Sequence, residues 1–261
     1  MYADTSSFHR WLQPLLRIGH AGAGALAPPN TLKSLALALD LGVDMLEFDV
    51  RPCRDNLVLL HDDDLAHFDR PGVLASRCAY QELRSLDAGE GEHIPTLSEA
   101  LDLAGGRSLL NIDLKAFGCE AGVLDLLGEN RLLPDSMISS LIPASLRRVK
   151  RIAPAIKTSL SYPEDRANAS RRAYLQPAVQ VALNVMRRSL PYRILGMLAQ
   201  AEADATTLYY RVISPATLKR VQRAGGRVFA WTVDDLEQMR SLQAMGIDGI
   251  TSNRPDLFAE L

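Results

Sequence analysis

Cysteine, surplus basic charge and long apolar runs are all scarce in this 261-residue sequence, and each scarcity excludes a class of protein. The three cysteines, Cys53, Cys78 and Cys119, are odd in number and show no CxxC spacing, which argues against a disulfide framework and a zinc site. The formal net charge of −2 gives no basic excess for nucleic acid. No apolar run reaches membrane-spanning length, and the first residues lack a signal-peptide core. We therefore expect a cytoplasmic protein with no nucleic-acid partner and no stable membrane insertion. These patterns leave its oligomeric state open.

Strand-like and helix-like segments alternate along the chain, which is typical of a parallel sheet with helices outside it. The length most simply suits one barrel-sized domain, although two domains would also fit, and we predict a single (β/α)8 barrel over residues 1–261, somewhat distorted. Such a barrel needs eight strands, and there is one candidate too many. We expect either 57–60 or 206–210 to be peripheral. The candidate strands are 15–18, 46–50, 57–60, 108–114, 137–140, 156–160, 206–210, 228–233 and 247–251.

Two segments interrupt this alternation. Residues 65–91 are polar and irregular, and we predict that they form a small insertion or a lid. Residues 163–202 have helical character, which Pro177 and Pro191 are expected to break. Both segments are therefore places where the barrel pattern is distorted.

A capping box marks the start of one helix. Residues 97–103 have helical spacing, Thr96 precedes them, and Glu99 lies three residues after that threonine. This arrangement lets each side chain bond to the backbone N–H of the other residue, so it predicts a helix that begins after Thr96.

Residues 46–50 combine a strand pattern with two carboxylates. Glu47 and Asp49 are at positions i and i+2, which places them on one face of a strand, while the apolar residues between and around them face the other way. Two buried carboxylates side by side are unfavourable unless a cation or a hydrogen-bond donor meets them. The pattern therefore indicates a metal, a basic partner or an exposed strand end.

Asp113 and Lys115 repeat this spacing on a second strand, so three acids and a lysine are expected at the carboxyl end of the barrel, where catalytic residues gather. Oxygen ligands alone suit Mg²⁺ or Ca²⁺ better than zinc. An internal ion-pair network, with Lys115 against Glu47 or Asp49, explains the same residues equally well.

Two histidines also follow strand candidates. His20 and His61 each enter a polar loop, where a histidine can act as a general acid or base, and Asp62 is placed to orient His61. Other polar residues that follow strand candidates are Ser139, Ser140, Thr232, Ser252 and Asn253.

A series of motifs in order resembles those of the glycerophosphodiester phosphodiesterases. The resemblance spans residues 18–255 and implies a TIM-type barrel that hydrolyses glycerophosphodiesters, with a metal, to glycerol 3-phosphate and an alcohol. The motifs are IGHAG, PPNT, GVDMLEFDVRPCRDNLVLLHDDDL, IPTLSEAL, NIDLK, MISS, FAWTVDD and GIDGITSNRPDL.

The resemblance also implies roles for individual residues and a small phosphodiester as the substrate. The implied set comprises Glu47, Asp49 and Asp113 as ligands of Mg²⁺ or Ca²⁺, His20 and His61 as base and acid, and Lys115 against the phosphate. Trp231, in the WTV motif, would line the glycerol side or pack in the core. A neighbouring glycerol hydroxyl would attack the phosphorus first and form a cyclic phosphate that water then opens.

Three positions depart from the family pattern. Ala21 replaces the arginine of the HRG motif, Pro29 replaces the glutamate of PENT, and Asp113 is shorter than the usual glutamate. Asp113 can still reach a dication if its strand lies closer or a water bridges the gap. With the arginine lost at position 21, we expect phosphate binding to be weaker or to be supplied by Arg51, which follows Glu47 and Asp49 on the same strand face.

Other functions fit some of these residues. A catalytically weakened barrel that binds a phosphorylated ligand would explain Ala21 and Pro29. A lysophospholipase D or sphingomyelinase-type preference belongs to related barrels. A glycosidase with two barrel carboxylates fits less well, because Glu47 and Asp49 share one strand instead of flanking a bond.

Overall fold

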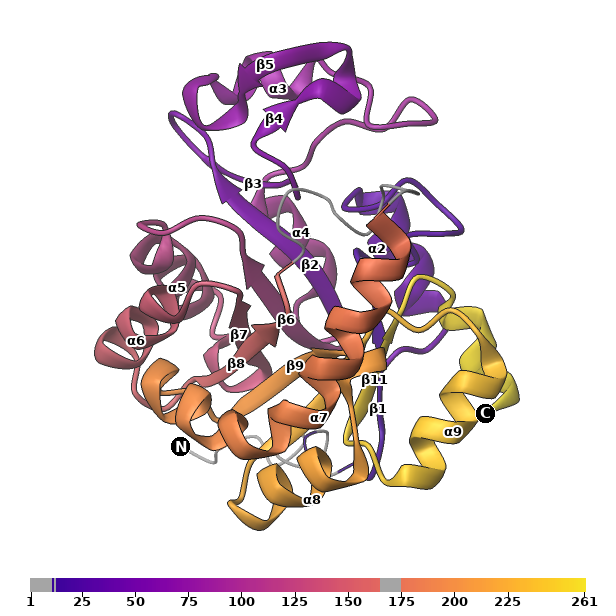
Figure 1. The fold of residues 1–261 in the computed structure, drawn as a ribbon. Coiled ribbons are helices and arrows are strands. Elements are labelled where there is room, and N and C mark those ends of the chain that lie inside the picture. Colours follow the sequence, from indigo (N-terminus) through magenta and orange to yellow (C-terminus); the bar gives the residue numbers. More distant parts are fainter. Residues whose placement is uncertain (1–10, 12, 165–174) are drawn as a thin grey trace.

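A computed structural model describes residue 11, residues 13–164 and residues 175–261 of the chain. Eight parallel strands close into a barrel, because β1 pairs with β2 on one side and with β11 on the other. Helices surround this barrel (Figure 1), so the predicted (β/α)8 fold is confirmed. Around the barrel the strands are β1 (Leu16–Gly19), β2 (Met45–Pro52), β6 (Leu109–Leu114), β7 (Ser136–Ser140), β8 (Lys157–Tyr162), β9 (Ala205–Tyr209), β10 (Arg227–Trp231) and β11 (Gly249–Ser252).

Among the described helices, α2, α4, α8 and α9 begin at polar caps, and the helices bury one apolar face against the strands. α2 starts after Thr31 and α9 after Asp235, and each cap side chain accepts a hydrogen bond from a backbone N–H of the first turn. The α-helices are α2 (Leu32–Asp40), α3 (Tyr80–Arg84), α4 (Leu97–Ala104), α5 (Glu120–Glu129), α6 (Pro143–Ile152), α7 (Gln176–Ala201), α8 (Pro215–Arg223) and α9 (Leu236–Met245). Short 3₁₀ helices are η1 (Ala66–Phe68), η2 (Ala75–Arg77), η3 (Leu133–Asp135), η6 (Tyr210–Val212) and η7 (Pro255–Glu260).

The peripheral strand is β3 (Leu57–Leu59), and residues 206–210 belong to the barrel as part of β9 and the turn after it. β2 is long enough to extend beyond the barrel, and β3 returns antiparallel along this extension, with Leu59 opposite Val50. The chain after β3 therefore comes back to the mouth of the barrel.

The chain between β3 and α4 forms a small unit over the end of β2 (Figure 1). It contains the antiparallel pair β4 (Asp64–Leu65) and β5 (Arg70–Leu74), followed by α3. Leu65 and Leu83 are fully buried in a hydrophobic cluster that is separate from the main core. The insertion or lid expected at 65–91 stays a prediction.

The expected break in the segment 163–202 is wrong for its described part. α7 runs without interruption over 26 residues, with Pro177 in its first turn and Pro191 inside it. A proline in the first turn costs nothing, because the N–H it lacks has no helical partner there. None of the described helices is both long and apolar enough to span a bilayer, and the cytoplasmic location stays a prediction. Residues 165–174 lie outside the described residues.

The inner face of the barrel changes from apolar to charged along the strands. Met45 and Leu109 pack with Phe229 in a cluster inside the amino-terminal half of the barrel. Side chains alternate between the two faces of a strand, so along β2 Glu47 and then Asp49 follow Met45 on the inner face. The apolar cluster thus closes the floor, and the carboxylates lie at the carboxyl-terminal mouth.

Candidate active site

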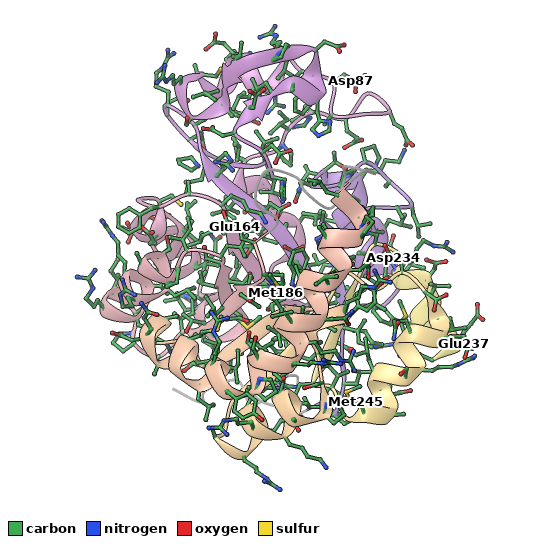
Figure 2. The ribbon with its side chains drawn as sticks, in the orientation of Figure 1. Asp87, Glu164, Met186, Asp234, Glu237 and Met245 are labelled. Carbon is green, nitrogen blue, oxygen red and sulfur yellow. The ribbon has the colours of Figure 1, made fainter. Side chains whose placement is uncertain are left out.

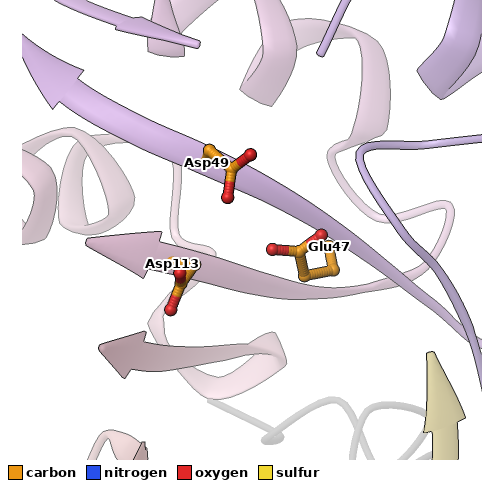
Figure 3. A group of neighbouring side chains, drawn as sticks. All are labelled: Glu47, Asp49 and Asp113. Carbon is orange, nitrogen blue, oxygen red and sulfur yellow. The ribbon is translucent and has the colours of Figure 1, made fainter. Parts of the chain in front are cut away.

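Three carboxylates from two adjacent strands meet at the mouth of the barrel. Glu47 and Asp49 lie on β2 and Asp113 on β6, and the parallel register places Asp49 directly opposite Asp113. One oxygen from each side chain lies within 4.8 Å of the others (Figure 3). The residues are only 5%, 3% and 6% exposed, respectively. The structure thus brings together the acids that the sequence proposed as metal ligands, including the short Asp113.

Backbone and hydroxyl donors fix two of these acids. The N–H of Ala21 donates to Glu47 Oε2 at 2.9 Å, and Ser139 Oγ donates to Asp113 Oδ1 at 2.7 Å. Ala21 has a φ of +46°, a left-handed conformation that turns its N–H toward the acid. At position 21 the chain therefore contributes its backbone to the site.

Asn30, to which no role was assigned from the sequence, fixes the third acid. Its Nδ2 donates to Asp49 Oδ2 at 2.8 Å, while its Oδ1 accepts from the Asp49 N–H at 3.0 Å. Asn30 is 8% exposed and has a φ of +59°, which asparagine tolerates better than most residues. The PPNT motif was the feature of the sequence that could have indicated this role. In it, Asn30 follows two prolines and precedes Thr31, the N-cap of α2.

Lys115 lies between two of the acids. Its Nζ is 2.9 Å from Asp49 Oδ1 and 2.5 Å from Asp113 Oδ2, and the lysine side chain is 15% exposed. Burial would lower the pKa of Lys115, but Asp113 and Asp49 raise it above its ordinary value, so the ammonium group stays charged. The ion-pair network considered from the sequence is therefore present.

This ion pair does not balance the charge of the cluster. Three carboxylates and one ammonium leave a formal charge of −2. Burial and the neighbouring Asp49 raise the pKa of Glu47 to about 7, despite an opposing effect of His20. Burial would also raise the pKa of Asp49, but Lys115, together with the histidines, holds it below its ordinary value. Lys115 thus pairs with Asp49 and Asp113, and among the described residues Glu47 has His20 alone as a potential cationic partner, at 3.9 Å.

A hard divalent cation fits this donor set. The cluster offers carboxylate oxygens alone, as Mg²⁺ and Ca²⁺ prefer, and its charge of −2 matches theirs. Asp49 Oδ1 is buried and, although near Lys115, accepts no hydrogen bond from the described residues. This oxygen retains a lone pair for a metal.

His20 follows β1 and is held by a chain of polar groups. Its Nδ1 lies 2.7 Å from Asn253 Oδ1, and Asn253 Nδ2 donates to Asp234 Oδ2 at 2.7 Å. Asp234 precedes α9 (Figure 2). Because the Asn253 amide nitrogen is used by the carboxylate, its oxygen must face the histidine. His20 Nδ1 therefore donates to Asn253, and Nε2 lies 3.9 Å from Glu47 Oε2.

His61 reaches the mouth through the antiparallel strand β3. The N–H of Leu60 donates to the carbonyl of Asp49 at 3.1 Å, which brings the following residue beside the acids. His61 Nδ1 lies 2.7 Å from Asp62 Oδ1, as expected, and its side chain is 58% exposed. Its side chain is therefore open to solvent.

Arg51 and Trp231 lie at the edge of the site. Arg51 donates to the carbonyl of His61 at 2.8 Å, and its Nε is buried without a hydrogen-bond partner in the described part of the chain. Trp231 ends β10 and is half-buried, with its ring 6.2 Å from that of Tyr209 in an edge-to-face contact. Both residues therefore border the mouth of the barrel.

Comparisons with known proteins agree on one family. The model of the glycerophosphoryl diester phosphodiesterase family matches residues 20–257. A glycerophosphodiester phosphodiesterase of Caldanaerobacter subterraneus subsp. tengcongensis is 29% identical over 260 residues, which cover 94% of this chain and 97% of that protein. The structure of an Oleispira antarctica phosphodiesterase in complex with the product sn-glycerol-3-phosphate has a TM-score of 0.75 and 25% identity, and covers 94% of this chain and 95% of that one. A glycerophosphodiester phosphodiesterase of Agrobacterium tumefaciens strain C58 has the same fold, with a TM-score of 0.74 and 24% identity, and covers 94% of this chain and 99% of that one.

Proposed function

Because this chain belongs to the glycerophosphoryl diester phosphodiesterase family, we propose that it hydrolyses glycerophosphodiesters to glycerol 3-phosphate and an alcohol at the cluster of Glu47, Asp49 and Asp113. The family resemblance of the ordered motifs is confirmed. The observation that carries the proposal is this buried cluster, with its excess of negative charge, at the mouth of a barrel. The Oleispira antarctica relative, solved with sn-glycerol-3-phosphate, supports the choice of product.

The three acids would hold Mg²⁺ or Ca²⁺. When bound, such an ion supplies Lewis-acid polarisation of a phosphoryl oxygen and neutralises the charge that develops there. The protein prepares this site before the ion arrives, because Ala21, Asn30 and Ser139 already orient the carboxylates.

The histidines would move the protons. His20 Nε2 takes the proton of the attacking hydroxyl, either the neighbouring glycerol hydroxyl or water, and Asn253 stabilises the resulting imidazolium through Nδ1. Glu47 and Asp49 raise the pKa of His20 against the effect of burial, so the proton is held more firmly. His61, with Nδ1 oriented by Asp62, gives a proton from Nε2 to the leaving alcohol oxygen.

Two cationic side chains would meet the phosphate. Lys115 keeps its charge between Asp49 and Asp113, so it can attract a phosphate without releasing a proton. Arg51 has a buried Nε with no partner among the described residues, and we propose that it replaces the arginine that is absent at position 21.

Turnover with defined metals tests this function. Purified protein is incubated with glycerophosphocholine and Mg²⁺ or Ca²⁺, and glycerol 3-phosphate is measured by a coupled dehydrogenase. We expect activity that chelator abolishes and that His61→Ala lowers by roughly 10²–10⁴-fold. His67→Ala is the matched control, because His67 also lies near Asp62, at 3.6 Å, and has no assigned role.

Two results would overturn the proposal. One is the absence of turnover on a panel of diesters while calorimetry shows bound metal. The other is binding of a phosphorylated ligand that is unaffected by His61→Ala, as a catalytically weakened barrel predicts. Release of choline from lysophosphatidylcholine in preference to glycerophosphocholine would instead indicate the lysophospholipase D-type alternative.

A further inference from the structure

Three neighbouring helices on one side of the barrel carry basic residues and no acidic residue. α6 contacts α7, and α7 contacts α8, so the three lie next to one another around the barrel (Figure 1). Because the formal net charge of the whole chain is −2, this positive charge is balanced by acids elsewhere in the molecule. The basic residues are Arg147, Arg148, Lys150 and Arg151 on α6, Arg187, Arg188 and Arg193 on α7, and Lys219, Arg220 and Arg223 on α8.

Most of these charges are not neutralised within the described part of the chain. Arg148 lies 3.5 Å from Glu120, and the Lys150 ammonium lies 2.6 Å from Asp204. The others that reach solvent have no acidic partner among the residues that the structure describes, so their field attracts anions. These exposed residues are Arg151, Arg187, Arg188, Arg193, Lys219, Arg220 and Arg223.

The outer face of α7 also exposes apolar side chains. Val181, Val185 and Tyr192 are 64%, 60% and 82% exposed. Successive residues of an α-helix are rotated by about 100°, so these three positions and Arg188 lie on one stripe along the helix. Leu190, which is buried in the core, lies on the opposite side of α7. This helix is therefore apolar both toward the barrel and toward solvent.

The stripe begins beside the mouth of the barrel. Arg211 follows β9, whose end is at the carboxyl-terminal edge, and it donates to Gln180 in α7 at 3.2 Å. Val181 is the next residue along α7, so the first exposed apolar side chains stand at the level of the mouth.

An anionic bilayer fits this combination of side chains better than other partners do. Aliphatic side chains enter the acyl boundary of a bilayer, tyrosine prefers its interface, and arginines meet the headgroup phosphates. A second copy of the chain, in a two-fold contact, would bring the same positive charges together. Nucleic acid would match the arginines but would leave Val181 and Val185 against phosphates and water.

We propose that the surface formed by α6, α7 and α8 docks reversibly on an anionic lipid bilayer, with the outer stripe of α7 in the headgroup region. The inference is independent of the proposed function, because none of these residues belongs to the candidate active site. Docking would hold the mouth of the barrel close to the lipid surface, since the stripe begins beside it.

Sedimentation with vesicles measures docking directly. The full chain is mixed with vesicles of phosphatidylcholine, either alone or with about one-third phosphatidylglycerol. We expect at least about 10-fold tighter binding to the anionic vesicles at ~0.05 M salt, and loss of that binding at ~0.5 M salt, where charges are screened. Equal binding to both kinds of vesicle, or binding to neither, would overturn the inference.

A pair of double variants separates this surface from net charge. Arg188→Gln with Arg220→Gln should weaken binding to anionic vesicles by about 25-fold, because each basic residue near such a surface contributes about 5-fold. Lys33→Gln with Arg240→Gln makes the same change in net charge on α2 and α9, and should bind as the wild type does. Equal losses in the two double variants would contradict the inference.

The apolar stripe is tested without changing the charge. Val181→Gln with Val185→Gln keeps side chains that suit a helix and should weaken binding to anionic vesicles by about 10-fold. Both valines are exposed, so Tm and the turnover of glycerophosphocholine without vesicles should stay unchanged, which separates lost docking from lost folding. Undiminished binding to vesicles would contradict the placement of the stripe in the headgroup region.

Two other results would assign this surface to a different partner and overturn the inference. One is binding of double-stranded DNA at a lower total phosphate concentration than the anionic vesicles require. The other is a dimer in analytical ultracentrifugation that Tyr192→Ser dissociates, which would make the outer face of α7 a contact between two copies of the chain.

Discussion

Asp49 is the acid on which the most polar neighbours converge. Asn30 holds one oxygen and the backbone N–H, Lys115 approaches the other oxygen, and the Asp49 carbonyl accepts from Leu60. Each contact comes from a different part of the chain. The position of this single carboxylate therefore depends on the loop after β1, on β6 and on the return of β3.

Loss of Asn30 should weaken metal binding more than it weakens the fold. Asn30→Ala removes both hydrogen bonds to Asp49, so the carboxylate is free to rotate and to pair more closely with Lys115. Removing a partner that orients a metal ligand typically costs 10–100-fold in affinity, and we expect a loss of about that size for Ca²⁺ or Mg²⁺. Isothermal titration calorimetry measures it. Asn130→Ala, on an exposed asparagine at the end of α5, is the control; equal affinities in both variants would refute the role of Asn30.

Site residues that lie on strands could be assigned roles from the sequence, whereas those that depend on contacts between loops could not. Glu47, Asp49 and Asp113 were proposed as a group because strand alternation alone places them on one face. Asn30 and Asn253 received no role, since their partners are fixed by loops that meet only in the folded chain. Asn253 bonds a histidine 233 positions away. Local spacing carries no information about such a contact.

The same contrast appears among the elements. The start of α4 was predicted correctly, because its capping box depends on four consecutive residues: Thr96 and Glu99 each bond to the N–H of the other. The surplus strand was left open between two candidates, because the pairing of β3 with β2 depends on how far β2 extends beyond the barrel. The break expected in α7 was wrong: Leu190 and Ile194, on either side of Pro191, are buried and hold both halves of the helix against the core. Neither pairing nor packing is visible in a local pattern.

The capping box of α4 should contribute measurably to stability. Burial alone would raise the pKa of Glu99, but hydrogen bonds from Thr96, Tyr80 and Arg84 lower it to about 2. The folded protein therefore holds this carboxylate ionised where the unfolded chain does not. Its contribution is complete above the ordinary pKa of 4.5 and is lost as the pH falls toward about 2.

Glu99→Ala should accordingly lower the free energy of unfolding by about 1–2 kcal/mol at neutral pH. Urea denaturation at pH 7 and at about pH 3.5 checks this, and the difference from the wild type should shrink at the lower pH. Glu82→Ala is an informative comparison, because Glu82 accepts a backbone N–H from Ala79 at the start of α3 but is exposed. A Glu99→Ala effect that does not change with pH would show that its ionised form contributes nothing.

At the scale of the whole molecule, the barrel separates an apolar floor from a charged mouth. Phe229 and Met45 fill the interior near the amino-terminal ends of the strands, while Glu47 and its partners lie near the carboxyl-terminal ends. The hydrophobic floor gives stability, and it also denies the acids above it access to water from below. Folding therefore buries excess negative charge at the mouth. The free-energy cost of this burial must be offset by the packing of the whole barrel.

A divalent cation should therefore stabilise the entire fold, in a way that depends on pH. Binding at 100 times the dissociation constant contributes about 2.7 kcal/mol, which corresponds to a rise in Tm of roughly 5–10 °C for a chain of this size. Without metal, Glu47 has a pKa of about 7 in the folded protein against an ordinary value of 4.5. The stability due to its bound proton is complete below the ordinary value and is lost as the pH rises through about 7.

Metal replaces that proton, so the rise in Tm should be larger at about pH 8 than at about pH 5.5, where metal must compete with protonation of Glu47. Differential scanning calorimetry of chelator-treated protein, with and without Ca²⁺ or Mg²⁺, measures both values. Glu47→Gln should reduce the rise and remove most of its pH dependence, whereas Glu237→Gln, on the exposed face of α9, should preserve both. If metal leaves Tm unchanged at both pH values, the acids do not form a metal site, and the charge of the mouth is met by Lys115 and protons alone.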